Sequence, residues 1–314
     1  MELPWTYFAL GLCIRSERPI LELAVCVDGA GCPGPVVEIR WAGLDPDLPG
    51  ARYRGPIIQV GDNEIQLAVG DIARFRMRAG NEIVVDALPG ASERDVRVYL
   101  LGAALGMLCH QRALLPLHAN AVVMRGRVVA IAGCSGAGKS TLAAHYHDKG
   151  YEILSDDVCA VSFPDEGAPL AWPGIPRLRL WRDSAEASGR DVERLEQVAD
   201  GLEKYHWPVK LHAALEGLPL ERIYVLSDAG RGTRPGISRL TGSDALEAVM
   251  EQTFRREYLG LMDGARQRFA NGIALLASVP VFRVPWPHDF GLLAAEAARL
   301  EDHILDDAMA DRAL

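Results

Sequence analysis

Residues 127–157 read RVVAIAGCSGAGKSTLAAHYHDKGYEILSDD, and this stretch determines the fold that the sequence predicts. It divides into an apolar strand, a glycine-rich loop, a helix closed by a glycine, and a second strand, over 127–132, 133–140, 140–150 and 151–155. A strand, loop, helix and strand in this order form a βαβ unit, which is the building block of α/β folds. The sequence therefore predicts an α/β protein.

The glycine-rich loop Gly133–Ser140 (GCSGAGKS) matches the pattern Gly-x-x-x-x-Gly-Lys-Ser, and we call it the P-loop. Glycines let the backbone curl so that N–H groups point at phosphate oxygens, and the following helix adds its N-terminal N–H groups. Lys139 can reach the β- and γ-phosphates of a nucleotide, and the Ser140 hydroxyl can hold Mg²⁺. Only four lysines occur in the chain, so a chance match is rare. We expect nucleotide contacts from Gly133, Ser135, Gly136, Ala137, Gly138, Lys139, Ser140 and Thr141.

Two acidic residues and one histidine flank this unit. Asp156-Asp157 follow the second strand, at the edge where α/β sheets place ligand sites. One carboxylate can bind Mg²⁺ and the other can take a proton from a hydroxyl, although adjacent Asp residues also suit a solvated turn. His118 precedes an apolar strand that is expected to pair with the P-loop strand, which places it near the level of Gly133. There it could bond a phosphate or orient an aspartate, or be an ordinary packed histidine.

The remaining sequence predicts a three-part organisation. Residues 1–90 alternate short apolar stretches with turn signals and predict a small β-rich N-terminal domain. A helix from about Glu93 to Arg112, capped by Ser92, is expected to connect this domain (through 91–112) to a P-loop domain over 113–314. Other segments predict strands over 120–124, 177–181, 222–226 and 279–285, and helices over 183–201, 243–252, 255–277 and 290–310.

Composition excludes several classes of protein. A net charge of −9 argues against a general nucleic-acid binder. Six cysteines without a CxxC pair indicate reduced thiols, and the N-terminal segment lacks the features of a signal peptide, so a cytoplasmic location is expected. The longest apolar run, 98–109, is shorter than the roughly 20 residues that span a bilayer. It is expected to form a buried helix, and no membrane partner is expected.

Three segments resemble a known family: Leu117–Val122 (LHANAV), the P-loop with Thr141, and Gly150–Asp157 (GYEILSDD). A histidine, a P-loop and a double aspartate at these intervals resemble the kinase core of HPr kinase/phosphorylase, which has a PEP-carboxykinase-like fold. The resemblance implies a serine/threonine-type kinase that uses ATP and Mg²⁺. The site residues that it implies are the catalytic base Asp157, its metal-binding neighbour Asp156 and the active-site histidine His118.

Further segments resemble one subgroup of this family, the HPr-kinase-like enzymes found with lasso and other ribosomal peptide clusters. These segments are Tyr7–Ser16 (YFALGLCIRS), Pro173–Trp181 (PGIPRLRLW) and Lys204-Tyr205. The subgroup implies phosphate transfer to the hydroxyl of the C-terminal residue of a precursor peptide. Residues 1–90 do not resemble the family's regulatory domain, and its glycine-rich signature after the core is not found. Neither phosphorylase activity nor the hexamer is therefore implied, and a homo-oligomer stays open.

Other functions fit parts of the sequence. A P-loop ATPase or GTPase is one, because Ile223–Asp228 could be a strand that ends in a metal-binding aspartate, although a turn also explains Asp228. A carrier-protein serine kinase and a non-catalytic nucleotide-binding scaffold are others, but the Asp pair after the P-loop helix favours a peptide or protein kinase. The cations expected to touch phosphate or a peptide carboxylate, or else to pair with surface acids, are Arg177, Arg179, Lys204 and Arg255.

Overall fold

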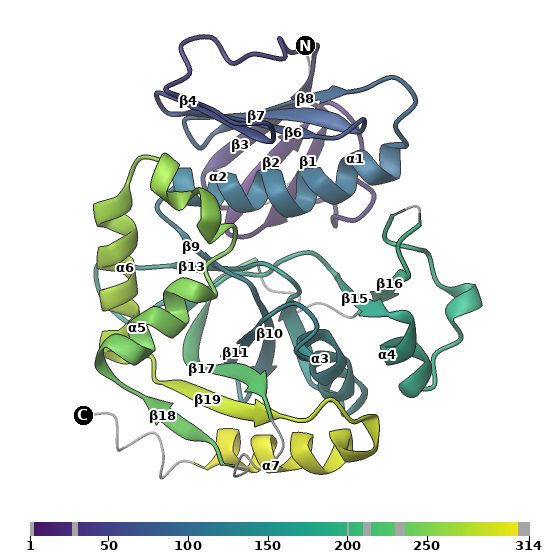
Figure 1. Cartoon of the computed structure of the whole chain (residues 1–314), viewed down its shortest axis with the longest axis vertical. Coiled ribbons are helices and arrows are strands. Elements are labelled where there is room, and N and C mark those ends of the chain that lie inside the picture. Colours follow the sequence, from purple (N-terminus) through teal and green to yellow (C-terminus); the bar gives the residue numbers. More distant parts are fainter. Residues whose placement is uncertain (1–2, 27–30, 200, 210–214, 230–235, 307–314) are drawn as a thin grey trace.

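The computed structural model describes residues 3–26, 31–199, 201–209, 215–229 and 236–306, and shows a mixed α/β fold with two large sheets (Figure 1). The first sheet has eight strands in the order β1-β2-β3-β8-β7-β6-β5-β4. Its strands are β1 (Trp5–Ala9), β2 (Leu12–Ser16), β3 (Val36–Trp41), β4 (Tyr53–Arg54), β5 (Ile58–Gly61), β6 (Glu64–Val69), β7 (Ala73–Arg78) and β8 (Glu82–Ala87). The first part of the chain is therefore rich in strands, as its turn signals predict.

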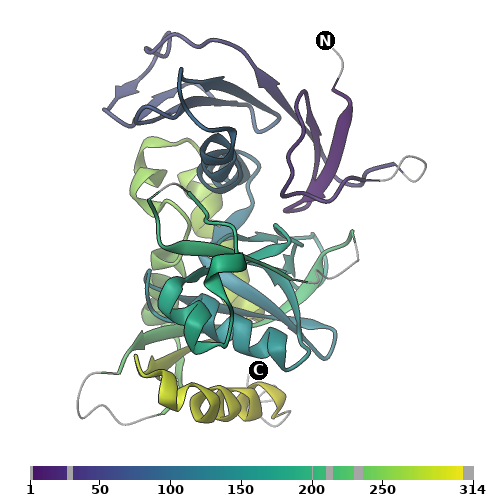
Figure 2. The ribbon, with the colours of Figure 1, turned by 90° about the vertical axis from the view of Figure 1, so that its right-hand side faces the viewer.

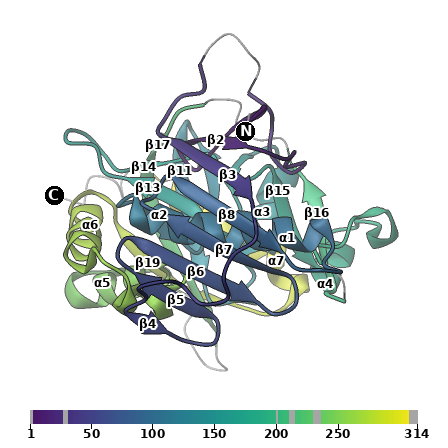
Figure 3. The ribbon, with the colours of Figure 1, turned by 90° about the horizontal axis from the view of Figure 1, so that it is seen from above.

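One long helix packs beneath the first sheet (Figure 3). It consists of α1 (Glu93–Tyr99), a π-helical segment η1 (Leu100–Ala104) and α2 (Leu105–Gln111). The hydroxyl of Ser92 accepts a hydrogen bond from the N–H of Asp95 at 3.1 Å, which caps the helix as expected. The predicted helix is confirmed, and the apolar run that it contains is buried; the π-helical segment is a feature that the sequence did not indicate. Within the described residues, no helix is both long and apolar enough to cross a membrane.

The first sheet, this helix and parts of the later chain share one hydrophobic core. Side chains from every strand of the sheet except β4 pack together with those of the helix. The same core includes Val158 and Ala160, directly after the Asp pair, and the distant residues Phe254, Leu259 and Met262. Figure 2 shows the helix end-on between the first sheet and the rest of the molecule. The segment that carries the Asp pair therefore packs on the first sheet's core.

The second sheet has nine strands and contains the P-loop strand. Its strands are β9 (Leu115–Leu117), β10 (Ala119–Met124), β11 (Arg127–Gly133), β12 (Glu152–Ser155), β13 (Cys159–Ser162), β14 (Leu170–Ala171), β17 (Leu218–Asp228), β18 (Ser238–Leu240) and β19 (Val281–Trp286). β11, β17 and β19 are parallel, whereas β10 lies antiparallel between β11 and β12. The helix α3 (Lys139–Asp148) joins β11 to β12. This confirms the predicted strand–loop–helix–strand unit, with β10 inserted between its two strands.

Helices cover both faces of the second sheet (Figure 1). Alternate residues of a strand point to opposite faces, so Val129 and Ile131 of β11 pack with α3 and α7 (Leu293–Leu305). Ala130 and Ala132 pack instead with α5 (Gly242–Glu251) and α6 (Ala265–Ser278). The apolar sequence of β11 after its exposed first residue, Arg127, follows from this burial on both faces.

Two of the predicted helices are wrong in length. The helix expected over 183–201 is only α4 (Arg182–Ala187), because Gly189 adopts a left-handed φ of 72°, and a 3₁₀ turn η2 (Val192–Arg194) follows. The chain then returns as β16 (Lys204–Pro208), which pairs with β15 (Arg177–Trp181). The helix expected over 255–277 is a 3₁₀ segment η3 (Arg256–Leu261) and then α6, separated by Gly264 at a φ of 86°.

The remaining expected elements are present with small shifts of their ends. Strand β17 is longer than the predicted 222–226 because its first residues pair with β14 and its later ones with β19. The closing helix begins with a 3₁₀ turn η4 (Phe290–Leu292) before α7, and the predicted residues 307–310 lie outside the described part of the chain.

Candidate active site

The register of three strands brings the predicted site residues to one edge of the second sheet. Ala119 of β10 pairs with Ala132 of β11, and Ala121 pairs with Ser155 of β12. Because β10 is antiparallel to its neighbours, its first residues lie beside the carboxyl ends of β11 and β12. The prediction that His118 lies near the level of Gly133 is therefore confirmed.

The P-loop backbone has a conformation that requires glycine at two positions. Gly133 has a φ of 145°, and a Cβ there would lie 2.8 Å from the carbonyl oxygen of Leu226. Gly138 caps α3 at a φ of 93°, and a Cβ there would lie 2.9 Å from the indole nitrogen of Trp286. The side-chain oxygen of Gln252 accepts a hydrogen bond from the Gly133 N–H at 2.9 Å. The loop is therefore held in place from both sides.

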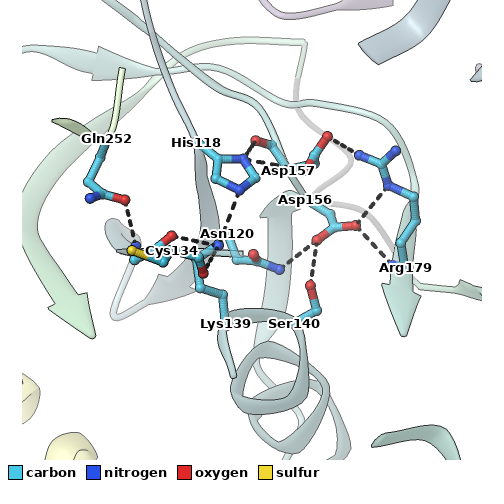
Figure 4. A network of polar contacts seen from close by, with 10 residues as sticks. His118, Asn120, Cys134, Lys139, Ser140, Asp156, Asp157, Arg179 and Gln252 are labelled. Atoms are coloured by element: carbon cyan, nitrogen blue, oxygen red, sulfur yellow. Dashed lines mark hydrogen bonds and ion pairs between the residues drawn. The ribbon is translucent and has the colours of Figure 1, made fainter. Parts of the chain in front are cut away.

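Lys139 is buried and uses its ammonium group within the site (Figure 4). Its Nζ donates to the carbonyl oxygens of Gly133 (2.7 Å) and Cys134 (3.0 Å), and lies 3.2 Å from Nε2 of His118. Burial lowers the pKa of Lys139, and the nearby carboxylates of the Asp pair oppose this effect. The ammonium group thus connects the P-loop to the histidine.

His118 connects Lys139 to Asp157. Since the Lys139 ammonium can only donate, Nε2 of His118 accepts, and Nδ1 carries the proton that is donated to the Asp157 carbonyl oxygen at 3.1 Å. Burial lowers the pKa of His118, which favours this neutral form. The Nδ1 atom also lies 3.4 Å from the Asp157 carboxylate. The histidine therefore fixes the segment that carries this carboxylate.

Asp156 is buried and fully hydrogen-bonded. Its Oδ1 accepts from Asn120 Nδ2 at 2.7 Å and from the Ser140 hydroxyl at 3.3 Å, and its Oδ2 accepts from the backbone N–H of Arg179 at 2.9 Å. Burial raises the pKa of Asp156, and the adjacent Asp157 adds to this rise while Arg179 opposes it. A carboxylate in this position would be stabilised by a further cation.

Asp157 lies at the sharpest point of the turn after β12, with a φ of 70°. Its carboxylate forms an ion pair with Nη2 of Arg179 (Figure 4). Burial raises the pKa of Asp157, but Arg179, His118 and Lys204 outweigh this effect and hold the pKa at about 2. The group is therefore ionised throughout the neutral pH range. A left-handed φ at a residue other than glycine is strained, and such strain is frequent at functional sites.

A cavity of about 430 Å³ opens above the P-loop, a size typical of small-molecule sites. P-loop residues, His118 and Asp157 line one end of it. Aromatic side chains line its walls, including Trp181, Trp286 and Phe290. The cavity therefore combines a glycine-rich loop with aromatic side chains.

The four predicted cations lie in different places. Lys204 lines the cavity, with Nζ 5.5 Å from the centre of the Trp181 ring. Arg179 pairs with the Asp pair. Arg177 is buried 3.5 Å from the Glu22 carboxylate, and burial lowers its pKa to about 10. Arg255 lies outside this cavity and lines a second one.

The strand-end aspartate Asp228 of the NTPase alternative lies beside two cavity-lining residues, Trp286 and His288, but does not itself line the P-loop cavity in the described part of the chain. Its side chain is 79% exposed at the end of β17, and its carboxylate is 3.9 Å from His288. It is absent from the described lining of the P-loop cavity. Its surroundings are those of a surface residue after a strand.

Sequence reasoning missed three site residues. Asn120 carried a signal, because it follows His118 by two positions and a strand places such residues on one face. Gln252 and Trp286 carried none, because each lies more than a hundred residues from the P-loop and meets it only through packing. Local patterns cannot indicate contacts of that kind.

No protein-family model and no curated protein matches the chain. Among solved structures it is similar to the Hpr(Ser) kinase/phosphatase from Coxiella burnetii, with a TM-score of 0.34 and 15% identity over 63% of this chain and 94% of that chain.

Proposed function

We propose that the chain is a kinase that transfers the γ-phosphate of ATP to a serine hydroxyl of a peptide. The observation that carries this proposal is the continuous network from the P-loop lysine Lys139 through His118 to Asp157, at the end of a cavity of suitable size. A P-loop occurs in several classes of nucleotide-binding protein and does not by itself indicate a kinase. An ionised aspartate held beside the loop's lysine is the additional group that a transfer to a hydroxyl needs.

The P-loop and Lys139 would bind the phosphates of the nucleotide. Lys139 bonds two backbone carbonyls of its own loop, which are neutral acceptors. Phosphate oxygens carry charge and make stronger hydrogen bonds with an ammonium group. We therefore expect the ammonium to exchange a carbonyl for phosphate oxygens when ATP binds, and Lys204 to contribute a second positive charge.

The residues present fit Mg²⁺. Mg²⁺ in nucleotide sites takes oxygen ligands, of which the protein supplies one or two and the phosphates and water the rest. Ser140 and Asp156 offer a hydroxyl and a carboxylate oxygen 3.3 Å apart. No larger cluster of His, Cys, Asp or Glu suited to a metal occurs among the described residues. When bound, the ion would neutralise charge on the phosphates.

Asp157 is the group that we assign to the acceptor hydroxyl. In the transfer step the hydroxyl oxygen forms a bond to the γ-phosphorus, the bond from that phosphorus to the oxygen of the β-phosphate breaks, and the hydroxyl proton passes to the Asp157 carboxylate. A carboxylate with a pKa of about 2 is a weak base. Phosphoryl transfer has a loose transition state, so a weak base that orients the hydroxyl and accepts its proton late in the step is sufficient.

The finer parts of the proposal come from the sequence. The family resemblance supports a PEP-carboxykinase-like P-loop core over 113–314, whereas the connecting helix over 91–112 and the β-rich N-terminal domain over 1–90 are proposed from the apolar and turn patterns of the sequence. The resemblance also supports an enzyme that modifies the C-terminal residue of a lasso-type precursor peptide, and the unpaired cysteines support a cytoplasmic location. An ATPase, by contrast, would release free phosphate and label no acceptor.

The test is mass spectrometry of a serine-ended peptide incubated with the protein, ATP and Mg²⁺. We expect a gain of one phosphate with the parent protein and none on a matched peptide ending in alanine. Asp157→Asn should keep ATP binding, measured as a thermal shift, but lose transfer, because an amide cannot take the proton. Transfer by the Asn variant at the parent rate would show that Asp157 is not the base, and release of free phosphate without any labelled acceptor would favour an NTPase.

A further inference from the structure

A second cavity, of about 410 Å³, is also lined by Asp157. Its walls are the long helix around η1 and the segment 251–257. Of the residues that line it, His118 and Asp157 also line the P-loop cavity, and in the described part of the chain no other residue lines both. The two cavities therefore meet at His118 and Asp157, and Asp157 is the residue that we assign to the acceptor hydroxyl.

We infer that this second cavity binds the acceptor, and that the acceptor is a hydroxyl-bearing chain with an anionic group beside its hydroxyl. The inference rests on the proposed function. In an in-line transfer the attacking and leaving oxygens lie on opposite sides of the phosphorus. When the nucleotide occupies the P-loop cavity, the second cavity is the space beside Asp157 that is available to the acceptor.

The helical wall of this cavity contains the π-helical segment η1. π-Helical turns are rare and occur frequently at functional sites. The segment places Gly102 at the cavity, and a Cβ at Gly102 would meet no atom within 4 Å. Glycine destabilises the middle of a helix relative to alanine, so a glycine beside open space keeps room for a ligand at a cost in stability.

The facing wall is anchored firmly to the same helix. The ring of Phe254 occupies a notch at Gly106, where a Cβ would lie 2.6 Å from the ring. The Phe254 N–H donates to the carbonyl oxygen of Pro116 at 2.8 Å, and its carbonyl oxygen lies 2.9 Å from Nε2 of His110. The cavity is therefore preformed, and the next residue, Arg255, takes a left-handed φ of 55°.

Arg255 and Arg256 are the exposed cations of the second cavity, which Arg179 and the carboxylates of Asp157, Glu251 and Glu257 also line. Each makes one long contact with a carboxylate, Arg255 with Glu257 at 3.5 Å and Arg256 with Glu251 at 3.6 Å. Exposed pairs of this kind contribute about 0–1 kcal/mol, and a guanidinium has five N–H donors, so an entering anion can bind bidentately. Arg177 and Arg179 are less suited to this role, because buried or partly buried carboxylates already hold them.

The position of the acceptor is tested with Gly102→Leu. The leucine side chain would project into the second cavity, and it favours a helix more than glycine does, so the fold should be kept. We expect transfer to a serine-ended peptide to fall at least 10-fold, while the thermal shift caused by ATP and Mg²⁺ stays at the parent value. Gly43→Leu is the matched control, because a Cβ at that exposed glycine also meets no atom within 4 Å. Parent-level transfer by Gly102→Leu would overturn the location.

The chemical class is tested with three peptides: one ending in serine with a free carboxylate, its C-terminal amide, and an amide with aspartate beside the serine. We expect the two acidic peptides to be phosphorylated at least 10-fold more efficiently than the plain amide. Arg255→Gln should raise KM for the acidic peptides with little change in kcat, whereas the exposed control Arg194→Gln should not. Preference for one acidic peptide would identify the source of the anionic group.

Two results would count against this inference and are distinguishable from failure of the proposed function. Equal phosphorylation of all three peptides would show that the protein does not recognise an anionic group beside the hydroxyl. If the parent labels none of them but still forms ADP in a reaction that Asp157→Asn abolishes, the acceptor assignment is wrong and the phosphoryl-transfer site stands. If no ATP cleavage depends on Asp157, the proposed function itself fails.

Discussion

Replacing Arg179 with glutamine removes the guanidinium that pairs with the Asp157 carboxylate. The two side chains are 14% and 21% exposed, so water compensates poorly for the loss. The pKa of Asp157 is about 2 against a usual value of 3.8, and this difference corresponds to about 2 kcal/mol of stability. We expect Arg179→Gln to lower the free energy of unfolding at pH 7 by about this amount or somewhat more, because a buried charge without its partner is costly.

The sign of the pH dependence follows from the lowered pKa. The stabilisation by the pair is fully present above about pH 4, where Asp157 is ionised in both the folded and the unfolded chain, and it is lost as the pH falls toward 2. In the variant the pKa of Asp157 rises, because less positive charge remains nearby to oppose the effect of burial, which raises this pKa. The difference in stability between parent and variant should therefore be largest at neutral pH and shrink as the pH falls below about 4.

The assay is urea unfolding followed by circular dichroism at several pH values from 3 to 7. Arg194→Gln is the control, since Arg194 is 85% exposed and its pair with Asp191 is of the kind that contributes about 0–1 kcal/mol. If Arg179→Gln lowers the free energy of unfolding at pH 7 no more than the control does, the strength assigned to the Arg179–Asp157 pair is refuted. A difference that stays constant down to pH 3 would refute the titration of Asp157 as its source.

Two further predictions concern the P-loop and the histidine. Lys139→Ala should abolish the thermal shift caused by ATP and Mg²⁺, because it removes the cation that faces the phosphates; an undiminished shift would contradict the P-loop assignment. His118→Ala should keep nucleotide binding but lower transfer about 10–100-fold, and His118→Asn should restore part of the rate because its amide can donate to the Asp157 carbonyl. Complete loss of nucleotide binding in His118→Ala would instead indicate a structural role.

The sequence predicted the βαβ unit and the level of His118 because both follow from local patterns. An apolar strand, a glycine-rich loop and a helix stop signal are each encoded within about ten residues. The pairing of β10 with β11 follows from the two-residue turn at Arg125-Gly126, which fixes the register of a hairpin. Residues at the start of one strand then face residues at the end of the other.

The contacts of Arg179 could not be predicted in the same way. Because Arg179 lies on one strand with Arg177, the sequence suggested that both would bind the same kind of group. Instead, Arg177 pairs with Glu22 and Arg179 pairs with the Asp pair. These partners belong to the first sheet's segment and to the turn after β12, and only the packing of the two parts decides which arginine meets which acid. The helices predicted at 183–201 and 255–277 were wrong in length for a related reason, since Gly189 and Gly264 interrupt them through backbone conformations that charge patterns do not reveal.

The shared core beneath the first sheet has a consequence for the order in which the chain folds during synthesis. The N-terminal strands leave the ribosome first, yet their core includes Phe254, Leu259 and Met262, which are made much later. We expect the early strands to remain incompletely packed until the last quarter of the chain emerges. Contacts between residues so far apart in sequence also slow folding, so the nascent chain should depend on chaperones for longer than a protein with local contacts would.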